Sequence, residues 1–494
     1  MKKRIYYLFV LLLPMLVRAQ DSAFVRTYGG VNMDIGRDVK ETPDHGFVVA
    51  GTTSSFGQGN TSMYLVKTDS MGIHKWSKNY GGLNSDWAYS IETTMDNGFL
   101  LSGFSNSFSS NYDPYVVKTD AGGNLLWEKI YGTDDWDFVY GSTLLPDSGF
   151  VLCGETYGNS IGGSDGYVIR IDKMGNQVWA AHVGTTTDDK LYKIIYLNNT
   201  LYAVGSTRQN GYLSGMLAKI DLAGNVAPLF VYDYAPASNQ ELACITVNST
   251  SQLVMGGHVN PDNITGTNDW LLKTDTMGTV VFSYSGTAGP TGLKRFEDIV
   301  CVEFDEIVTS GISTGGNGGL GLFMVRFDAN GLYIAADNFG SFYDDYGHAV
   351  TLTQNKHLAF VGSTKSFGCG DEDMYLIMNR NQHFVANSKL NNKYYCDTLG
   401  LVVVDLKKTT VTGLRTACYP NPFSDKLTID IQGDIVDHST FYFELKDMQG
   451  RAVYTSDIAA GSTELLIQNI EAGMYFYAIY SGKEQVSSGK LIQQ

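Results

Sequence analysis

Five aspartates recur at equivalent places in this chain and are the residues best suited to bind a ligand. Each follows a "YGG"-like segment and stands where a strand is predicted to begin: Asp34, Asp86, Asp137, Asp188 and Asp345. Carboxylate oxygens suit Ca²⁺ and polyhydroxyl ligands. The alternative is structural, with each carboxylate accepting hydrogen bonds from N–H groups of its own loop. Recurrence in nearly every repeat favours the structural role. We therefore expect no cofactor, with Ca²⁺ left open as the one metal that these residues suit.

Other chemical signatures are missing from the sequence. The eight histidines show no metal-ligand spacing, and neither a G-x-S-x-G nor a phosphate-binding motif occurs. We therefore assign no catalytic residue. An enzyme would need non-repeated acidic and basic residues that meet at one place, and the most irregular insert, residues 283–298, is where we expect them. Whether the chain is an enzyme is left uncertain, with a non-catalytic role favoured.

A repeat of about 51 residues organises most of the chain. An apolar run ends in glycine at Gly51, Gly103, Gly154, Gly205, Gly256, Gly311 and Gly362. Each copy contains four short runs rich in β-branched and aromatic residues, separated by turn residues such as "MDNG" and "TDAGG". Seven four-stranded units of this length predict an all-β fold, a seven-bladed β-propeller over residues 20–389.

A D-x-x-G motif joins the third and fourth strands of the units. Its first three copies are Asp69 with Gly72, Asp120 with Gly123, and Asp172 with Gly175, and a tryptophan follows each. The aspartate can bond turn backbone, the glycine supplies a positive φ, and the tryptophan anchors one sheet on the next. The motif resembles the tryptophan-docking repeats of quinoprotein propellers, but that resemblance covers only this structural hairpin.

The strand that closes the ring is predicted to come from the start of the mature chain. "DSAFVRTYGG", residues 21–30, reads like a fourth strand without its first three partners. We expect residues 22–28 to complete the seventh blade, with residues 383–389 as the rival. Residues 1–19 combine a basic start, a short apolar stretch and Ala19, which is typical of a signal peptide. No later stretch is long and apolar enough for a transmembrane helix.

The C-terminal residues have a different composition. After a stretch of linker character, residues 390–414, come Tyr419-Pro420-Asn421-Pro422-Phe423, a turn from Asp447 to Gly450, and Gly473-x-Tyr475. Residues 415–494 resemble the type A sorting domain of type IX secretion substrates in the Bacteroidota. The resemblance implies a small β-sandwich that is read by the outer-membrane translocon. It also implies a route through the periplasm to a secreted or surface-attached state.

The net charge and the predicted fold limit the classes of function that this chain can have. A net charge of −16 argues against a nucleic-acid partner, because phosphate neutralisation needs clustered Lys and Arg. We expect a non-catalytic binding or adhesion module at the cell surface, with an extracellular glycan or protein as ligand. The alternative is a glycan-active or other extracellular enzyme with its site on the axial face. A purely structural surface component is the third class.

Overall fold

The computed structural model describes residues 23–493, except 261–265, 287–291, 315–318, 341–342, 369, 380–390, 395–414, 420–422, 433–439, 448–450, 460, 469, 471–472 and 482–483. The predicted signal peptide, residues 1–19, lies outside this range. The chain divides into two compact units, residues 1–399 and 400–494, which are described separately. Among the described residues, no helix is long and apolar enough to cross a membrane.

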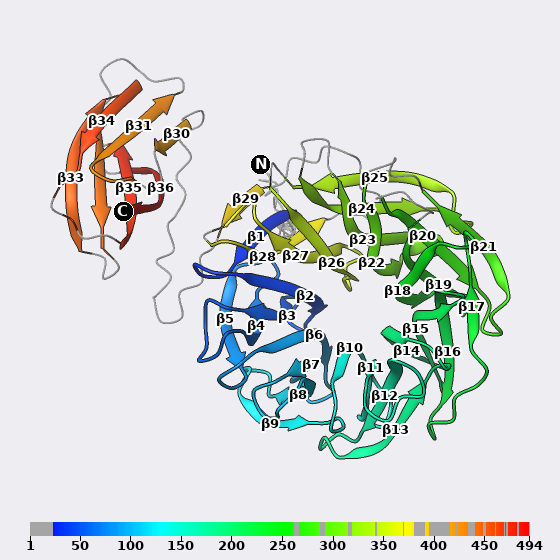
Figure 1. Ribbon diagram of the computed structural model, residues 1–494. Coiled ribbons are helices and arrows are strands. Elements are labelled where there is room, and N and C mark those ends of the chain that lie inside the picture. The colour runs from blue at the N-terminus through cyan, green and yellow to red at the C-terminus, as the bar shows by residue number, and fades with distance from the viewer. Residues whose placement is uncertain are drawn as a thin grey trace, which may run out of the picture. The chain divides into compact units, whose positions relative to one another are not determined.

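The first unit is a ring of seven sheets (Figure 1). Blades one to three are β2 (Asp34–Glu41), β3 (Phe47–Thr53), β4 (Ser62–Thr68), β5 (His74–Tyr80); β6 (Asp86–Thr93), β7 (Phe99–Ser105), β8 (Asp113–Thr119), β9 (Leu125–Ile130); and β10 (Asp137–Leu144), β11 (Phe150–Thr156), β12 (Asp165–Ile171), β13 (Gln177–Val183).

Blades four to six continue this pattern, and a single 3₁₀ helix, η1 (Glu303–Asp305), follows β22. The strands are β14 (Asp189–Leu197), β15 (Thr200–Gln209), β16 (Tyr212–Asp221), β17 (Phe230–Tyr232); β18 (Asn239–Val247), β19 (Leu253–Asn260), β20 (Asn268–Thr274), β21 (Val280–Ser285); and β22 (Lys294–Cys301), β23 (Ile307–Thr314), β24 (Leu320–Phe327), β25 (Tyr333–Phe339).

The seventh blade joins the two ends of the ring. β26 (Asp345–Leu352), β27 (Leu358–Thr364) and β28 (Asp373–Asn379) are completed by β1 (Phe24–Tyr28), which pairs antiparallel with β28 from Phe24↔Met378 to Tyr28↔Met374. The prediction for residues 22–28 is thus confirmed, and the predicted seven-bladed propeller is the observed fold. The rival segment, 383–389, lies outside the described residues.

One short strand differs from the predicted organisation. β29 (Asn391–Tyr394) pairs in parallel with β1, although its residues fall in the predicted linker 390–414. The physical reason is the outer edge of β1, whose N–H and C=O groups would otherwise be unpaired. The other residues of that linker, 390 and 395–414, lie outside the described part of the chain.

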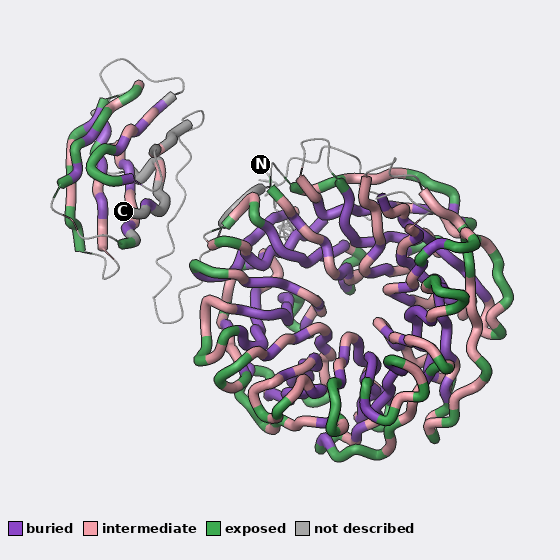
Figure 2. The backbone as a smooth tube through the Cα atoms, in the orientation of Figure 1, coloured by how far each residue is buried: buried purple, intermediate pink, exposed green. Residues whose placement is uncertain are grey.

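Burial follows the order of strands within each blade (Figure 2). The two middle strands are almost wholly buried, as in β3 and β4, because neighbouring blades cover both of their faces. The first strand alternates between buried and partly exposed residues in its first half, as in β6. A register shift follows, for example between Ala88 and Ser90. The inner strand therefore presents alternate side chains toward the axis of the ring.

The second unit is a pair of sheets. One sheet contains β30 (Arg415–Tyr419), β31 (Lys426–Gln432) and β34 (Gly461–Leu466). The other contains β33 (Ala452–Ala459), β32 (Thr440–Lys446), β35 (Gly473–Ser481) and β36 (Glu484–Gln493). Leu427 and Ile429 of the first sheet share a buried cluster with Phe443 and Ile479 of the second. This is the sandwich that the resemblance implied.

Candidate functional site

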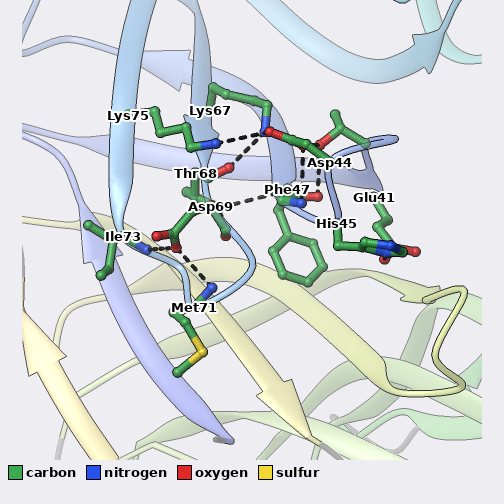
Figure 3. Close-up of polar contacts among 12 residues, drawn as sticks. Glu41, Asp44, His45, Phe47, Lys67, Thr68, Asp69, Met71, Ile73 and Lys75 are labelled. Atoms are coloured by element: carbon green, nitrogen blue, oxygen red, sulfur yellow. Dashed lines mark hydrogen bonds and ion pairs between the residues drawn. The ribbon is translucent and has the colours of Figure 1, made fainter. Parts of the chain in front are cut away.

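The D-x-x-G turns join the third and fourth strands at one edge of the blades, which we call the turn edge. Figure 3 shows the turn at Asp69. Asp69 Oδ1 accepts hydrogen bonds from the N–H groups of Met71 at 2.8 Å and Ile73 at 2.9 Å. Gly72 has a φ of +69°. Lys67 adds a 3.0 Å ion pair to Asp44, in the neighbouring turn of the same blade. The same pair of backbone hydrogen bonds recurs at Asp120, Asp172, Asp221, Asp275 and Asp328.

Each turn glycine also packs under an aromatic ring of the preceding blade. A Cβ atom on Gly123 would lie 2.7 Å from the Trp76 ring, and one on Gly175 would lie 2.9 Å from Trp127. Tyr80 Oη donates a 2.7 Å hydrogen bond to the Gly123 carbonyl. The aspartate closes the turn and the glycine admits the ring, so the motif is accounted for by folding.

The predicted aspartates lie at the opposite edge, which we call the axial face. Asp34, Asp86, Asp137 and Asp345 are the first residues of their blades' inner strands and are buried. Asp188 is a correction to the prediction. The equivalent residue is Asp189, which begins β14 and pairs with Thr207 as Asp137 pairs with Thr156.

The misassignment of Asp188 has a simple cause. Residues 188 and 189 are both aspartate, and the register of β14 buries only the second one. Asp188 instead forms a 2.9 Å ion pair with Arg208. The sequence carried a usable signal, because each of the other four aspartates follows the first glycine of its loop by five residues, and Gly184 is five residues before Asp189.

Three of the predicted aspartates close their own loops. Asp34 Oδ2 accepts the N–H of Gly30 at 2.7 Å, and Asp86 Oδ2 accepts the N–H of Gly82 at 2.9 Å. Asp137 Oδ2 bonds both the N–H and the hydroxyl group of Thr133, at 2.5 and 2.8 Å. Burial raises the pKa of Asp86, against the hydrogen bonds that lower it. The hydrogen bonds to loop N–H groups that the structural alternative predicted are therefore present at these three aspartates.

The side chains that do not repeat lie on the inner strands. The second and fourth residues of the inner strands vary more between blades than the first ones do, and the fourth ones touch from blade seven through blades one to four in a belt. Its successive contacts are His348 to Arg37 at 3.4 Å, Arg37 over the Tyr89 ring at 4.9 Å, Tyr89 to Tyr140 with ring centres 5.3 Å apart, and Tyr140 to Tyr192 at 6.0 Å. One structural position of the repeat thus carries an imidazole, a guanidinium or a phenol, depending on the blade.

Aromatic rings gather on one side of this belt. The aromatic sector, as we call it, consists of Trp87, Tyr89, Phe104, Tyr112, Trp136, Phe138, Tyr140 and Tyr157 from blades two and three. Phe104 and Phe138 meet edge to face at 4.9 Å, and Tyr89 stacks on Phe104 at 5.4 Å. Trp136 is 53% exposed and Tyr157 is 41% exposed. The sector therefore combines a packed base with accessible ring surface.

Charged and hydroxyl groups border the aromatic sector. Lys190 Nζ lies 4.5 Å from the centre of the Tyr140 ring and 3.1 Å from Glu155. Tyr140 Oη donates to Glu155 at 2.7 Å, and Tyr192 Oη donates to Glu241 at 2.9 Å. Burial and these carboxylates raise the pKa of both tyrosines, so both hydroxyl groups stay protonated at neutral pH.

A second layer of charge lies further along the inner strands. Lys40 Nζ is 3.5 Å from Asp38 and 3.9 Å from Glu92, and Lys193 Nζ is 3.4 Å from Asp298. Asp298 also accepts the N–H of Val350, in the next blade, at 3.1 Å. Burial lowers the pKa of Lys193, but the Asp298 and Asp38 carboxylates outweigh it and raise that pKa. Burial raises the pKa of Glu92 against the opposing effect of Lys40.

The predicted irregular insert contributes to this layer only through its end. Arg295 and Asp298 belong to β22, while residues 287–291 lie outside the described part of the chain. A pocket of about 390 Å³ opens elsewhere, at the turn edge between blades two and three, and is lined by apolar groups such as Met95, Leu126 and Met174. The polar pair beside it, Lys118 and Asp96, is already closed by a 3.0 Å ion pair.

No ready-made metal cluster is present in the described residues, since no three His, Cys, Asp or Glu side chains converge there. Sequence reasoning also missed the belt and the aromatic sector, because it followed the residues that recur. Positions that vary in chemistry at a fixed place in the repeat were the signal that could have found them.

The motif residues of the C-terminal unit occupy strand ends and the core. Tyr419 ends β30 and Gly473 begins β35, whereas Phe423 and Tyr475 are buried. Pro420, Asn421 and Pro422 lie outside the described residues. Asp447 closes its turn by accepting the N–H of Arg451 at 2.9 Å. The family model of the secretion system C-terminal sorting domain matches residues 417–494.

These residues are a sorting domain. The protein is therefore a type IX secretion substrate that is secreted or attached to the cell surface. No curated protein matches the chain. Two of the similar solved structures are the extracellular domain of a hybrid two-component system from B. thetaiotaomicron and an endo-arabinase from Bacteroides thetaiotaomicron.

The likeness to these structures is distant. The first has 11% identity and a TM-score of 0.44, covering 93% of this chain and 56% of that one. The second has 10% identity and a TM-score of 0.33, covering 50% of this chain and 95% of that one. This chain thus spans little more than half of the first structure, and at these TM-scores the likenesses carry no argument about ligand or activity.

Proposed function

We propose that the exported propeller is a non-catalytic binding module that holds an extracellular glycan over the aromatic sector. The sector itself is the observation that carries the proposal. Its packed base fixes the rings in place, so that little side-chain entropy is lost when a ligand arrives. Sugar rings have apolar faces that pack on aromatic rings, and Trp136 and Tyr157 offer such surface.

The charged border supplies the polar half of glycan recognition. Sugar hydroxyls need directional hydrogen-bond partners. Tyrosine hydroxyls hold Glu155 and Glu241 at the edge of the sector, and Lys190 lies over the Tyr140 ring and pairs with Glu155. A site of this kind is a set of aromatic surfaces with a few well-placed polar groups. A ligand is expected here and not at the D-x-x-G turns, whose polar groups are used by folding.

The test is a glycan array probed with the mature chain, followed by affinity measurements on variants. Trp136→Ala should weaken binding of the best glycan by roughly 10-fold or more, as for an exposed aromatic anchor. Tyr343→Ala is the matched control, because Tyr343 is also exposed and lies in the corresponding loop before blade seven. Absence of any glycan ligand, or equal loss in both variants, would contradict the proposal.

A glycan-cleaving enzyme is the second candidate, and the inner charged layer favours it. Burial raises the pKa of Glu92, which lies 3.9 Å from Lys40, and a raised carboxyl pKa is the direction that general acid catalysis needs. The same glycans should be assayed for hydrolysis. Cleavage that disappears in Glu92→Gln while binding persists would establish the enzyme, and binding without cleavage would support the module.

A further inference from the structure

Two carboxylates from neighbouring blades meet at the boundary between blades two and three. Asp113 begins β8 and Asp137 begins β10. A Cβ atom on Gly132 would lie 2.6 Å from Asp113 Oδ1 and 2.8 Å from Asp137 Oδ2, so both oxygens border the same small space. The chain leaves that space open by placing glycine at residue 132.

Both carboxylates are buried and neither is fully used. Asp113 is 4% exposed and Asp137 is 0% exposed. Asp113 Oδ1, which borders the space, lacks a hydrogen-bond partner within the described part of the chain, and so does Asp137 Oδ1, whereas Asp137 Oδ2 accepts hydrogen bonds from Thr133. Neither aspartate forms an ion pair among the described residues. Leaving a buried charged oxygen without a partner is unfavourable, and two such groups side by side also repel each other. Burial raises the pKa of Asp113, and the charge of Asp137 raises it further.

Three other boundaries of the same ring have a basic or neutral side chain at this place, whereas the boundary between blades seven and one also brings together two buried aspartates, Asp34 and Asp373. Between blades five and six, Lys294 offsets the charge of buried Asp269. Between blades four and five the corresponding residues are neutral, Ser214 and Gln240. Between blades three and four, His182 Nδ1 lies 3.1 Å from Asp165 Oδ2. The boundary between blades two and three has two carboxylates and no counterpart of Lys294 or His182 in the described residues.

We propose that Asp113 and Asp137 bind a divalent cation, Ca²⁺, at the boundary between blades two and three. Ca²⁺ accepts six to eight oxygen ligands in flexible geometry, so two carboxylates can be joined by backbone carbonyls and water. The cation would offset the carboxylate charge here, as Lys294 does between blades five and six. The site stands apart from glycan binding and goes beyond the proposed function.

Terbium luminescence tests the site directly. Tb³⁺ replaces Ca²⁺ and emits when a nearby phenol or indole is excited, and Tyr112 and Trp136 precede the two aspartates in sequence. We expect sensitised emission from the mature protein, competed away by Ca²⁺, and its loss in Asp113→Asn/Asp137→Asn. Asp86→Asn is the matched control and should keep the emission, because the residue that corresponds to Asp113 at that boundary is Ser62, which begins β4 and is not a carboxylate.

A second variant guards against a folding defect. Asp113→Ser/Asp137→Gln copies the pair found between blades four and five. It should fold, and the part of the Ca²⁺-dependent rise in Tm that belongs to this boundary should be lost. The proposal is overturned if Tb³⁺ emission is the same in wild type and in both double variants. It is also overturned if the stability of the wild type responds to pH but not to Ca²⁺, which would indicate a proton shared by the two carboxylates.

Discussion

Asp120 and Asp137 show how differently the two edges of a blade use one residue type. Asp120, at the turn edge, accepts the N–H groups of Gly122 and Asn124 at 2.8 Å and the side-chain amide of Asn124 at 2.9 Å. Those bonds lower its pKa. Asp137, at the axial face, is buried, and only one of its oxygens has a described partner. Recurrence in the repeat marks both residues, but only the second has a buried oxygen without a described partner.

The contrast extends to the surroundings of each edge. At the turn edge, glycine, aspartate and the aromatic ring of the preceding blade recur with almost the same contacts. At the axial face, the inner strands place aromatic, basic and acidic groups at one structural position. A repeat can conserve its scaffold at one edge and vary part of its chemistry at the other, because blade packing constrains the turns more than the side chains that point toward the axis.

The largest effect is expected from deleting residues 21–30, which removes part of the scaffold. Without β1, β28 loses its antiparallel partner and Gly72 loses the hydrogen bond from Tyr28 at 2.7 Å. An unpaired edge strand exchanges its amide protons faster. Hydrogen exchange should show lost protection in β28 before the other blades. Unchanged protection of β28 would mean that another segment closes the ring.

A smaller but still large effect is expected from Gly123→Ala. The residue has a φ of +74°, and the added Cβ would lie 2.7 Å from the Trp76 ring. Strain and overpacking together should lower the free energy of unfolding by about 2–4 kcal/mol. Gly211→Ala is the control, because Gly211 has a φ of +90° but nothing within 4 Å of the added atom.

Chemical denaturation of both glycine variants measures the difference. The control should lose only about 1 kcal/mol, the cost of the backbone conformation alone. Equal losses would show that Trp76 yields to the new methyl group, and that the turn edge is less tightly packed than its recurrence indicates.

The third effect concerns pH at the axial face. Because the pKa of Asp113 is raised on folding, its contribution to stability is fully present below the unfolded pKa near 4 and is lost as pH rises through the folded pKa. In the presence of chelator, Asp113→Asn should therefore raise stability at pH 7.5 by roughly 1 kcal/mol.

The gain from Asp113→Asn should shrink as the pH falls toward 4. Thermal unfolding from pH 4 to pH 8 measures it, and saturating Ca²⁺ should reverse its sign at neutral pH. A variant that is less stable than wild type at pH 7.5 under chelator would show that the unpaired oxygen has a partner that the structure does not describe.

The smallest effect is expected from Asp120→Ala, whose pKa shift has the opposite sign. A lowered pKa contributes stability that is present above the unfolded pKa near 4 and lost as pH falls through the folded pKa. The variant should therefore be slightly less stable than wild type at pH 7, and the two should converge in acid. Ca²⁺ should not change this difference in stability. A calcium-dependent difference would contradict the assignment of cation binding to the axial face alone.

Much of the architecture was readable from local sequence. The period of the apolar runs predicted seven blades, the likeness of residues 21–30 to a fourth strand predicted ring closure, and the C-terminal motifs predicted the sorting domain. These features depend on residues close together in the chain, where hydrogen-bond chemistry and turn geometry leave few choices.

The candidate site was decided by tertiary structure. Contacts such as Asp113 with Asp137, or Tyr89 with Tyr140, join blades and depend on how each sheet twists against the next. A register difference of one residue decided that Asp189, and not Asp188, is buried. The sequence by itself determined the blades, the turns and the export signal, because short-range interactions specify them. Only the closed ring decided which side chains face one another, because residues of different blades meet only once the blades have packed.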